Sequence, residues 1–388
     1  MAFNPLEIPL REIFAQQVHI AVIKPYLTTI QSAAEQQDLF NQLHESGAPP
    51  PYRLSVLKHV IANLDHFSIV DDINEEYAQL VIANSRVTEI EAAGGVRDSI
   101  VIYRFAGAEI RISEERNVLA KAGGTGYRTW EAALALGDFL LTSGLFDPHQ
   151  PYSFVELGSG TGFASHVATR MFGGGDAPDR ISCGCAAGCA GSGRFVADAC
   201  TRATNGHNGR EGGENPQRTS LGGLSEVCGL ENKTNCATQC NSMRPSALLT
   251  PNAIVATDCD EEILNRLQQS SPKFEVMPLR WTETITDEIV RVQETVGENP
   301  YILAADVLFE PSLFAAFFAT VRSLISKRTF ALVATTIRNE DTYALLGPAC
   351  AAAGLVHKCV QVYNSSHRSK LFYMPAESCV EIVRISLA

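Results

Sequence analysis

The sequence predicts an α/β fold in which a doubly wound, mostly parallel sheet follows a helical amino-terminal region. Residues 1–95 place apolar side chains at helical spacing, whereas residues 96–388 alternate short apolar runs with helical segments. Several of these runs end in an acidic residue. One run leads into a glycine-rich turn at 158–162, which is typical of the first strand–helix unit of a nucleotide-binding sheet.

Composition limits the class of protein. With 388 residues, 45% hydrophobic and 19% charged, the chain resembles an ordinary globular protein of about two domains. The first residues lack the pattern of a signal peptide, and no apolar run approaches the length of a membrane span. The net charge of −12 and the lack of a basic stripe argue against direct nucleic-acid binding. Eleven cysteines without a secretion signal favour reduced thiols, so we expect a cytoplasmic protein without a membrane partner.

The amino-terminal region, 1–95, is expected to consist of helices near 7–24, 31–45 and 73–84, with a further helix after three prolines at 49–51. The apolar residues of that further helix share one face and are Leu54, Leu57, Val60, Ile61 and Leu64. No motif in this region suggests chemistry. We interpret it as an interaction or packing module.

The second domain, 96–388, begins with a strand in which Val101, Tyr103 and Phe105 alternate. A glycine-rich stretch at 123–126 precedes a helix with Trp130 on its apolar face. The remaining elements are expected in the following order: a strand at 154–157, a helix at 164–172, a strand at 252–258, a helix at 261–269, a strand at 276–281, a strand at 301–306, a helix at 312–326, a strand at 329–336, a helix at 341–353, and strands near 355–363 and 379–387. The last strands are candidates for antiparallel pairing.

A long insertion interrupts this pattern at 173–250. It holds 14 of the 29 glycines and 7 of the 11 cysteines, and Phe195 is its only aromatic residue. Such a segment buries too little apolar surface to offset its ordering entropy, so we predict disorder. The insertion is either a species-specific loop or translated sequence that the functional protein lacks. Its cysteines do not match a zinc motif, because C-x-C-x₃-C from Cys183 and C-x₃-C from Cys236 differ from paired C-x₂-C knuckles. We therefore predict no metal site.

The glycine-rich turn determines the kind of ligand that the sequence predicts. The fingerprint G-x-G-x-x-G would need a glycine at position 163, where the chain has Phe163. Glu156 lies two residues before Gly158, and a carboxylate there repels a pyrophosphate but helps to hold an amine and a sulfonium. S-adenosylmethionine therefore fits this turn better than NAD.

Asp258 is the candidate for binding the ribose of such a ligand. It ends the strand after the turn, 102 residues beyond Glu156, and removing the 78 residues of 173–250 reduces that separation to 24. This is close to the usual distance between a glycine turn and its ribose-binding acid. Two alternatives remain: Asp258 caps the next helix, or Asp260 binds the ribose.

Asp306 is the candidate for the reacting end of the site. It ends a strand that a doubly wound order places beside the glycine turn, and ligands bind at that edge. Its carboxylate could orient an amine for methyl transfer. The alternative is a helix N-cap, because Pro311 and Ser312 follow closely. The two tryptophans, Trp130 and Trp281, are compatible with core positions as well as with the site.

Five motifs in order resemble the seven-β-strand protein-lysine methyltransferases, also called methyltransferase family 16. They are Thr-Trp130-Glu-Ala-Ala, Glu156-Leu-Gly-Ser-Gly-Thr-Gly, Thr-Asp258, Leu-Arg-Trp281 and Ala-Ala305-Asp306-Val-Leu-Phe309. The resemblance covers about 97–388 without the insertion. It implies a Rossmann-like seven-stranded methyltransferase sheet. It also implies S-adenosylmethionine contacts from Trp130, Gly158, Ser159, Gly160, Asp258, Trp281 and Ala305, to which the carboxylate charge considered above adds Glu156.

Two further segments resemble the branch of this family that methylates a lysine of elongation factor 2. They are Gly124-Thr-Gly-Tyr-Arg-Thr-Trp130 and Thr335-Thr-Ile-Arg-Asn339-Glu-Asp-Thr342. The family motif Asp-x-x-Tyr or Asp-x-x-Phe corresponds to Asp306 and Phe309, near which the substrate lysine would lie. With Phe309 in place of a tyrosine, any role for a phenol hydroxyl is lost, but the ring could still wall the lysine channel and contact the ammonium.

The sequence thus predicts a cytoplasmic, monomeric, S-adenosylmethionine-dependent protein-lysine N-methyltransferase acting on elongation factor 2. Asp306 would position the neutral amine for direct attack on the methyl group. Two alternatives differ in what the same fold does. One is a related methyltransferase with another protein or small-molecule substrate, and the other is a non-catalytic scaffold.

Overall fold

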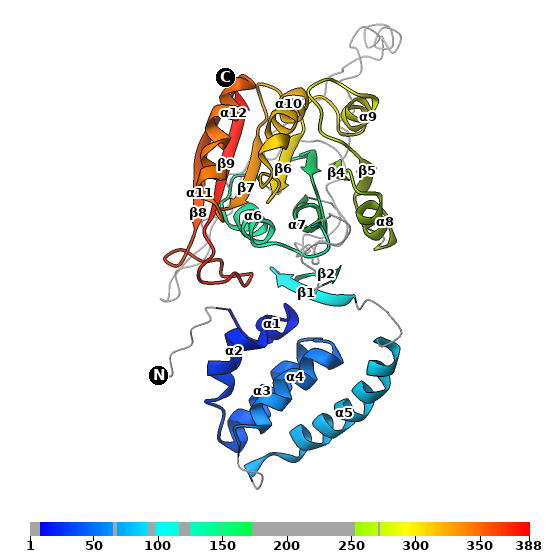
Figure 1. The fold of residues 1–388 in the computed structure, drawn as a ribbon, viewed down its shortest axis with the longest axis vertical. Coiled ribbons are helices and arrows are strands. Elements are labelled where there is room, and N and C mark those ends of the chain that lie inside the picture. Colours follow the sequence, from blue (N-terminus) through cyan, green and yellow to red (C-terminus); the bar gives the residue numbers. More distant parts are fainter. Residues whose placement is uncertain are drawn as a thin grey trace, which may run out of the picture. The chain divides into compact units, whose positions relative to one another are not determined.

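A seven-stranded sheet, counted over the described residues, forms the centre of the carboxyl-terminal region in the computed structural model (Figure 1). Its order is β5-β4-β3-β6-β7-β9-β8, and β9 runs antiparallel to both of its neighbours. The strands are β3 (Phe154–Leu157), β4 (Ile254–Asp258), β5 (Glu275–Pro278), β6 (Tyr301–Ala305), β7 (Ala331–Thr336), β8 (Leu355–Tyr363) and β9 (Val380–Leu387). The predicted doubly wound, mostly parallel sheet is confirmed.

The structure describes residues 8–64, 68–91, 98–115, 125–147, 149–172, 253–270 and 272–388, with backbone alone for 85–91. The insertion predicted at 173–250, with its cysteines, lies outside these residues. Within them, no helix is long and apolar enough to cross a membrane.

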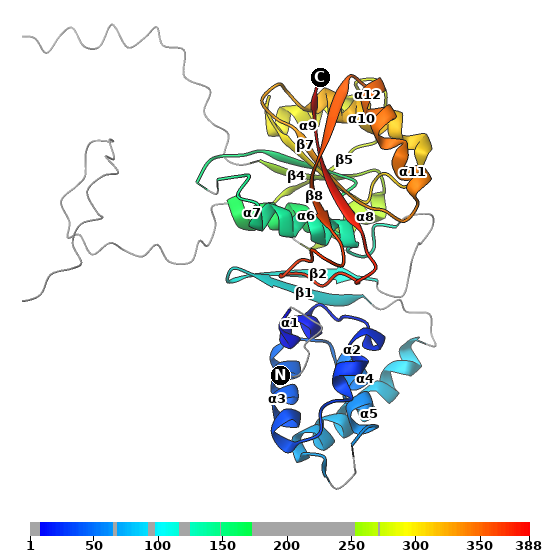
Figure 2. The same ribbon diagram turned by 90° about the vertical axis from the view of Figure 1, so that its left-hand side faces the viewer.

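Helices cover both faces of the sheet because successive residues of each strand point to opposite sides (Figure 2). Phe154 packs against α6 (Glu131–Thr142), α7 (Phe163–Phe172) and α8 (Glu261–Gln269). Its neighbour Val155 belongs to the opposite core, with α9 (Asp287–Val296), α10 (Phe314–Leu324) and α12 (Leu346–Ala352). A short 3₁₀ helix, η2 (Pro311–Leu313), precedes α10, and α11 (Glu340–Ala344) precedes α12. Because helices cover both faces, a ligand would reach the parallel strands at their carboxyl ends.

The amino-terminal region contains α1 (Leu10–Ala15), α2 (Ile20–Leu27), α3 (Ala33–Glu45), α4 (Pro50–Ile61) and α5 (Asp71–Glu91), which share one apolar core. The prediction of one helical segment near 7–24 is wrong in detail. Gln17 has a φ of 50°, so the chain turns between α1 and α2, and His19 caps α2. The side-chain amide of Gln16 anchors this turn, because its Nε2 donates to Leu371 O (3.1 Å) and its Oε1 accepts from Tyr373 N (2.7 Å).

A two-stranded hairpin links this region to the sheet domain. β1 (Ser99–Phe105) pairs with β2 (Ala108–Glu114) around a two-residue turn in which Ala106 and Gly107 both have positive φ. The sequence predicts β1 but misses β2. It also misses α9, whose apolar residues Ile289, Val292 and Val296 occur at helical spacing between charged residues.

Candidate functional site

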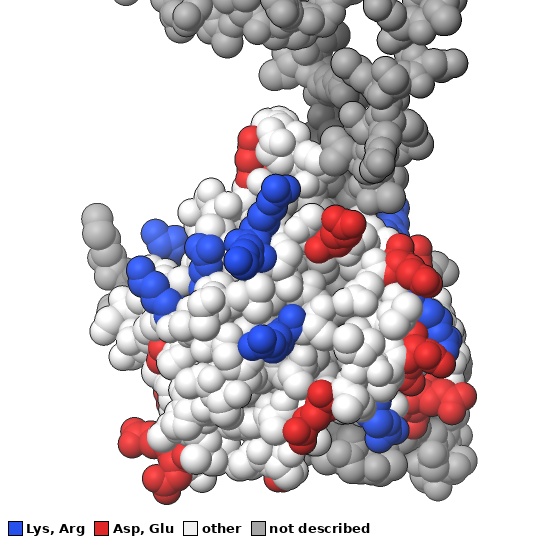
Figure 3. All heavy atoms as spheres, turned by 90° about the horizontal axis from the view of Figure 1, so that it is seen from above, with Lys and Arg blue, Asp and Glu red and all other residues white. Residues whose placement is uncertain are grey.

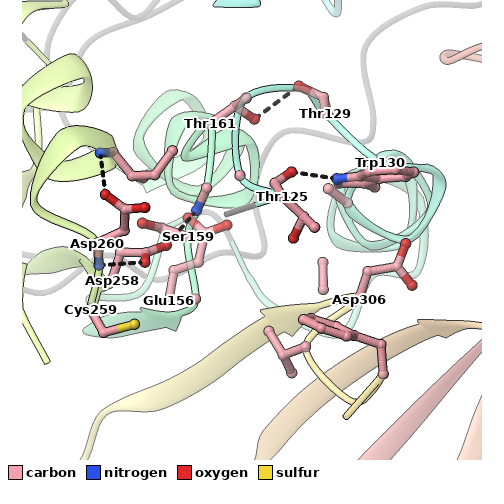
Figure 4. A pocket seen from close by; sticks show the side chains of 18 of the residues that line it. Thr125, Thr129, Trp130, Glu156, Ser159, Thr161, Asp258, Cys259, Asp260 and Asp306 are labelled. Atoms are coloured by element: carbon pink, nitrogen blue, oxygen red, sulfur yellow. Dashed lines mark hydrogen bonds between the residues drawn. The ribbon is translucent and has the colours of Figure 1, made fainter. Parts of the chain in front are cut away.

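A cavity of about 700 Å³ lies at the carboxyl ends of β3, β4 and β6 (Figure 4). This is the edge at which ligands bind in doubly wound sheets, and the volume suits a ligand of nucleoside size. In the close view, Glu156 and Asp258 lie on one side of the cavity, and Trp130 and Asp306 lie on the other. All of the candidate cofactor-binding residues line it: Trp130, Glu156, Gly158, Ser159, Gly160, Asp258, Trp281 and Ala305.

The glycine turn keeps one wall of the cavity free of side chains. Gly158 has a φ of 64°, and a Cβ at this position would lie 2.8 Å from a methyl group of Val307. Gly160 has a φ of 51°, and its Cβ would lie 3.2 Å from the Cα of Gly126. Between them, Ser159 has a buried hydroxyl without a hydrogen-bond partner among the described residues. An unpartnered hydroxyl beside an open turn is suited to bind a polar ligand.

Glu156 is a buried carboxylate at the base of this wall. Its Oε2 accepts a hydrogen bond from the backbone N of Ser165 in α7 at 2.8 Å. Burial raises the pKa of Glu156 to about 7, although hydrogen bonds from Ser165 and Ala164 act in the opposite direction. A cationic ligand group nearby would therefore favour its ionised form.

Asp258 ends β4 with its carboxylate bonded to the turn. Oδ2 accepts from Gly160 N and Oδ1 accepts from Asp260 N, both at 3.1 Å. The helix cap of α8 is Asp260, whose side chain accepts from Glu262 N and Ile263 N. The alternative that Asp258 caps this helix is therefore wrong. Burial raises the pKa of Asp258, while hydrogen bonds from Asp260 and Gly160 lower it.

The two tryptophans line the cavity on different walls, rather than being enclosed in the core. Trp130 precedes α6 as its N-cap residue instead of lying on its apolar face, and its indole N donates to Thr125 O at 2.8 Å. The guanidinium of Arg128 lies 4.4 Å from its ring centroid. Trp281 packs edge-on against Phe317, with ring centroids 5.1 Å apart.

Asp306 follows β6 with a φ of 54°, a backbone conformation that few residues other than glycine, asparagine and aspartate adopt readily. Its Oδ1 accepts from Thr336 N (2.8 Å), and its Oδ2 accepts from Thr336 Oγ1 (2.9 Å) and Arg338 Nη2 (3.2 Å). Glu310, rather than Asp306, caps η2, so the N-cap alternative is wrong. Burial raises the pKa of Asp306, opposed first by the charge of Arg338.

Phe309 lies on the rim of the cavity and is 61% exposed. An exposed aromatic ring has little role in the core, so a partner that enters this cavity would contact it. No group of three or more His, Cys, Asp or Glu side chains in the described part of the chain could hold a metal ion.

Three charged residues at this end are missing from the sequence-based site. Arg338 bonds Glu131 Oε2 at 2.8 Å as well as Asp306, and its guanidinium lies 5.1 Å from the Trp130 ring centroid. Arg128 pairs with Glu131 Oε1 at 3.5 Å. The sequence motifs contain all three residues, but only the fold brings 131 and 338 together.

Residues 246–346 match a family model described as lysine methyltransferase. A Chaetomium thermophilum protein named Protein-lysine N-methyltransferase EFM3 is 23% identical over 355 residues, which cover 84% of this chain and 81% of that protein. Together these matches support a protein-lysine N-methyltransferase. The Saccharomyces cerevisiae protein of the same name is 31% identical over 118 residues, 28% of this methyltransferase and 33% of that protein.

The methyltransferase also has a partial structural likeness to Aeropyrum pernix fibrillarin, solved in complex with S-adenosylmethionine. The TM-score is 0.32, the identity 12%, and the match covers 73% of this chain and 81% of that one. This likeness is too low to carry a conclusion about function. The match to the lysine methyltransferase model supports S-adenosylmethionine as the cofactor, and the open turn, the Ser159 hydroxyl and the carboxylates of Glu156 and Asp258 fit its polar groups.

Proposed function

We propose that this methyltransferase uses S-adenosylmethionine to methylate a lysine side chain of translation elongation factor 2. One observation carries the proposal. Asp258, Trp281 and Asp306 belong to the family-matched segment 246–346 and line the same cavity. The sequence predicts cofactor contacts for Asp258 and Trp281 and a substrate contact for Asp306, so one cavity would hold both reactants side by side.

The chain's own residues would bind and orient the reactants. S-adenosylmethionine supplies an electrophilic methyl group, which a neutral lysine amine can attack. Asp306 would accept a hydrogen bond from that amine, and Trp130 and Phe309 would wall the channel. Holding both groups in reactive geometry is a large source of rate acceleration.

A protein substrate is supported by the printed names of the two relatives, both protein-lysine N-methyltransferases. Elongation factor 2 is supported by the two segments at 124–130 and 335–342 that resemble that branch of the family. We further propose that the enzyme acts as a monomer in the cytoplasm. On the face in Figure 3, Lys and Arg lie mainly at upper left, and Asp and Glu lie mainly along the right and lower edges. The net charge of −12 supports a partner other than nucleic acid.

The test is to incubate the purified chain with labelled S-adenosylmethionine and a lysate from cells that lack the enzyme. We expect one labelled band, identified by mass spectrometry as elongation factor 2 with the label on one lysine. A band at another protein would contradict the substrate but keep the chemistry. Binding of S-adenosylmethionine without any transfer would favour the non-catalytic scaffold.

A further inference from the structure

A three-residue bridge crosses the substrate end of the cavity. Arg338 Nη2 lies 2.8 Å from Glu131 Oε2 and 3.2 Å from Asp306 Oδ2. The side chains of Glu131 and Asp306 are 14% and 9% exposed, so both carboxylates are largely withdrawn from water. Arg338 therefore links the start of α6 to the end of β6, two elements that the sequence separates by more than a hundred residues.

The bridge determines which oxygen of Asp306 remains available. A carboxylate oxygen can accept about two hydrogen bonds. Oδ2 already accepts from Thr336 Oγ1 and Arg338, whereas Oδ1 accepts only from Thr336 N among the described residues. A further donor would thus be directed to Oδ1.

The loop that carries Arg338 is itself fixed on both sides. Two residues before Arg338, Thr336 donates to Asp306. One residue after Arg338, the side chain of Asn339 accepts hydrogen bonds from Asp341 N and Thr342 N and so caps α11. The guanidinium also lies over the ring of Trp130. Arg338 is therefore held by three contacts, to Glu131, Asp306 and the Trp130 ring, rather than by a single surface ion pair.

The protonation of Asp306 also depends on the charged groups around it. The charged groups near Asp306 are Arg338 after β7, and Glu131 and Arg128 at the start of α6. Burial favours the neutral acid, and the positive charge of Arg338 favours the carboxylate. A proton on Oδ1 would turn this oxygen into a donor and weaken it as an acceptor for an amine.

We propose that Arg338 is a positioning residue of the methyl-transfer site, which, anchored by Glu131 and stacked on Trp130, fixes the Asp306 carboxylate with Oδ1 directed to the substrate amine. The proposal rests on the proposed function, because it assigns this carboxylate to a lysine substrate. Glu131 acts one step further away, through Arg338.

The first experiment measures steady-state kinetics of Arg338→Gln, Arg338→Lys and Glu131→Gln from pH 6 to pH 9. We expect kcat to fall about tenfold or more in Arg338→Gln, the loss typical of a charge-assisted hydrogen bond, with the cofactor Kd unchanged. The acidic limb of its pH profile should move to higher pH, and Arg338→Lys should restore part of kcat. Arg291→Gln, an exposed change on α9, is the matched control. Equal loss in all variants without a shift of the pH profile would overturn the proposal.

The second experiment does not depend on turnover. Carboxyl ¹³C NMR of aspartate-labelled protein, with the Asp306 signal assigned from Asp306→Asn, reports its titration directly. We expect Arg338→Gln to raise the titration midpoint and Glu131→Gln to raise it less. Unchanged midpoints in both variants overturn the positioning role. If the variants show these shifts but the wild-type enzyme methylates no protein, the proposed function would be overturned instead.

Discussion

Thr336 holds Asp306 at two points: its backbone N donates to Oδ1 at 2.8 Å, and its hydroxyl donates to Oδ2 at 2.9 Å. Thr336 ends β7, and Asp306 directly follows the neighbouring parallel strand β6. Because both donors come from one residue, the plane of the carboxylate is fixed relative to the sheet. The end of the cavity that carries Asp306 is thus anchored to the sheet.

Replacing Asp306 by asparagine should remove the charge while keeping the backbone, since asparagine also tolerates a φ of 54°. We expect kcat to fall by about 100-fold or more, the cost of misplacing a reacting group, with S-adenosylmethionine affinity nearly unchanged. Asp306→Ala should lose the same activity and also melt at a lower temperature, because alanine is strained at this φ. Turnover assays, calorimetric titration and thermal melting separate these effects. Normal methylation by Asp306→Asn would show that the site is misassigned.

Replacing Glu156 by glutamine should alter the pH dependence of stability. The folded pKa of about 7 lies above the ordinary value of 4.5. Proton binding therefore stabilises the fold by at most roughly 3 kcal/mol below pH 4.5, and this stabilisation is lost as the pH rises through about 7. Glu156→Gln should remove this slope in urea melts of the cofactor-free protein. An unchanged slope would contradict the assignment, and Glu275→Gln on the exposed edge of β5 is the control.

The same substitution should weaken S-adenosylmethionine binding. If the carboxylate faces the cationic end of the cofactor, wild-type affinity should fall as the pH drops below about 7. Glu156→Gln should bind about tenfold or more weakly at pH 8 and show little dependence on pH. Calorimetric titration at several pH values measures both. Equal affinities of the two proteins at pH 8 would place the cofactor's charge elsewhere.

Replacing Phe309 by alanine should affect the substrate rather than the fold. Its ring is 61% exposed, so we expect stability to change by less than about 0.5 kcal/mol. The KM for the protein substrate should rise, the cofactor Kd should stay constant, and Phe309→Tyr should retain activity. Ile285→Ala, which removes a side chain 68% exposed on another loop, is the control. A loss of cofactor binding in Phe309→Ala would contradict a role at the substrate end.

Deleting 173–250 should leave cofactor binding intact. The segment lies between the end of α7 at Phe172 and the start of β4 at Ile254. The start of a parallel strand lies at the edge of the sheet opposite to the cavity, so a short loop there closes an ordinary strand–helix–strand unit. Equal S-adenosylmethionine Kd values and equal kcat values for the shortened and full chains are expected. Loss of binding on deletion would show that the segment contributes to the site.

Local patterns are sufficient to predict most of the sheet and the cofactor side of the cavity. Apolar runs such as 301–305 mark buried strands, and the acids that end them meet at one edge because parallel strands share a direction. β2 also carries a strand signal, since Ile110 and Ile112 alternate with polar residues, but the pattern is short and was overlooked. Whether a residue caps a helix was also not decided by sequence, since Asp260 and Glu310 compete with nearby acids for the same N–H groups.

The charged bridge could not be predicted, because it depends on tertiary distance. Glu131 and Arg338 are 207 residues apart, and neither belongs to a spacing pattern that indicates pairing. Only the order β6-β7 in the sheet and the position of α6 over it bring them together. The sequence motifs include Glu131 and Arg338, but only the fold shows that the two side chains are partners.

The left-handed backbone at Asp306 also limits which residues can replace it. Glutamate would keep the charge, but its longer side chain is poorly tolerated at a φ of 54° and could not reach both donors of Thr336 in the same way. Glycine and asparagine suit the backbone but carry no charge. Among these residues, only aspartate combines a tolerated backbone conformation with a short carboxylate. Substitutions at this position should therefore abolish activity rather than change specificity gradually.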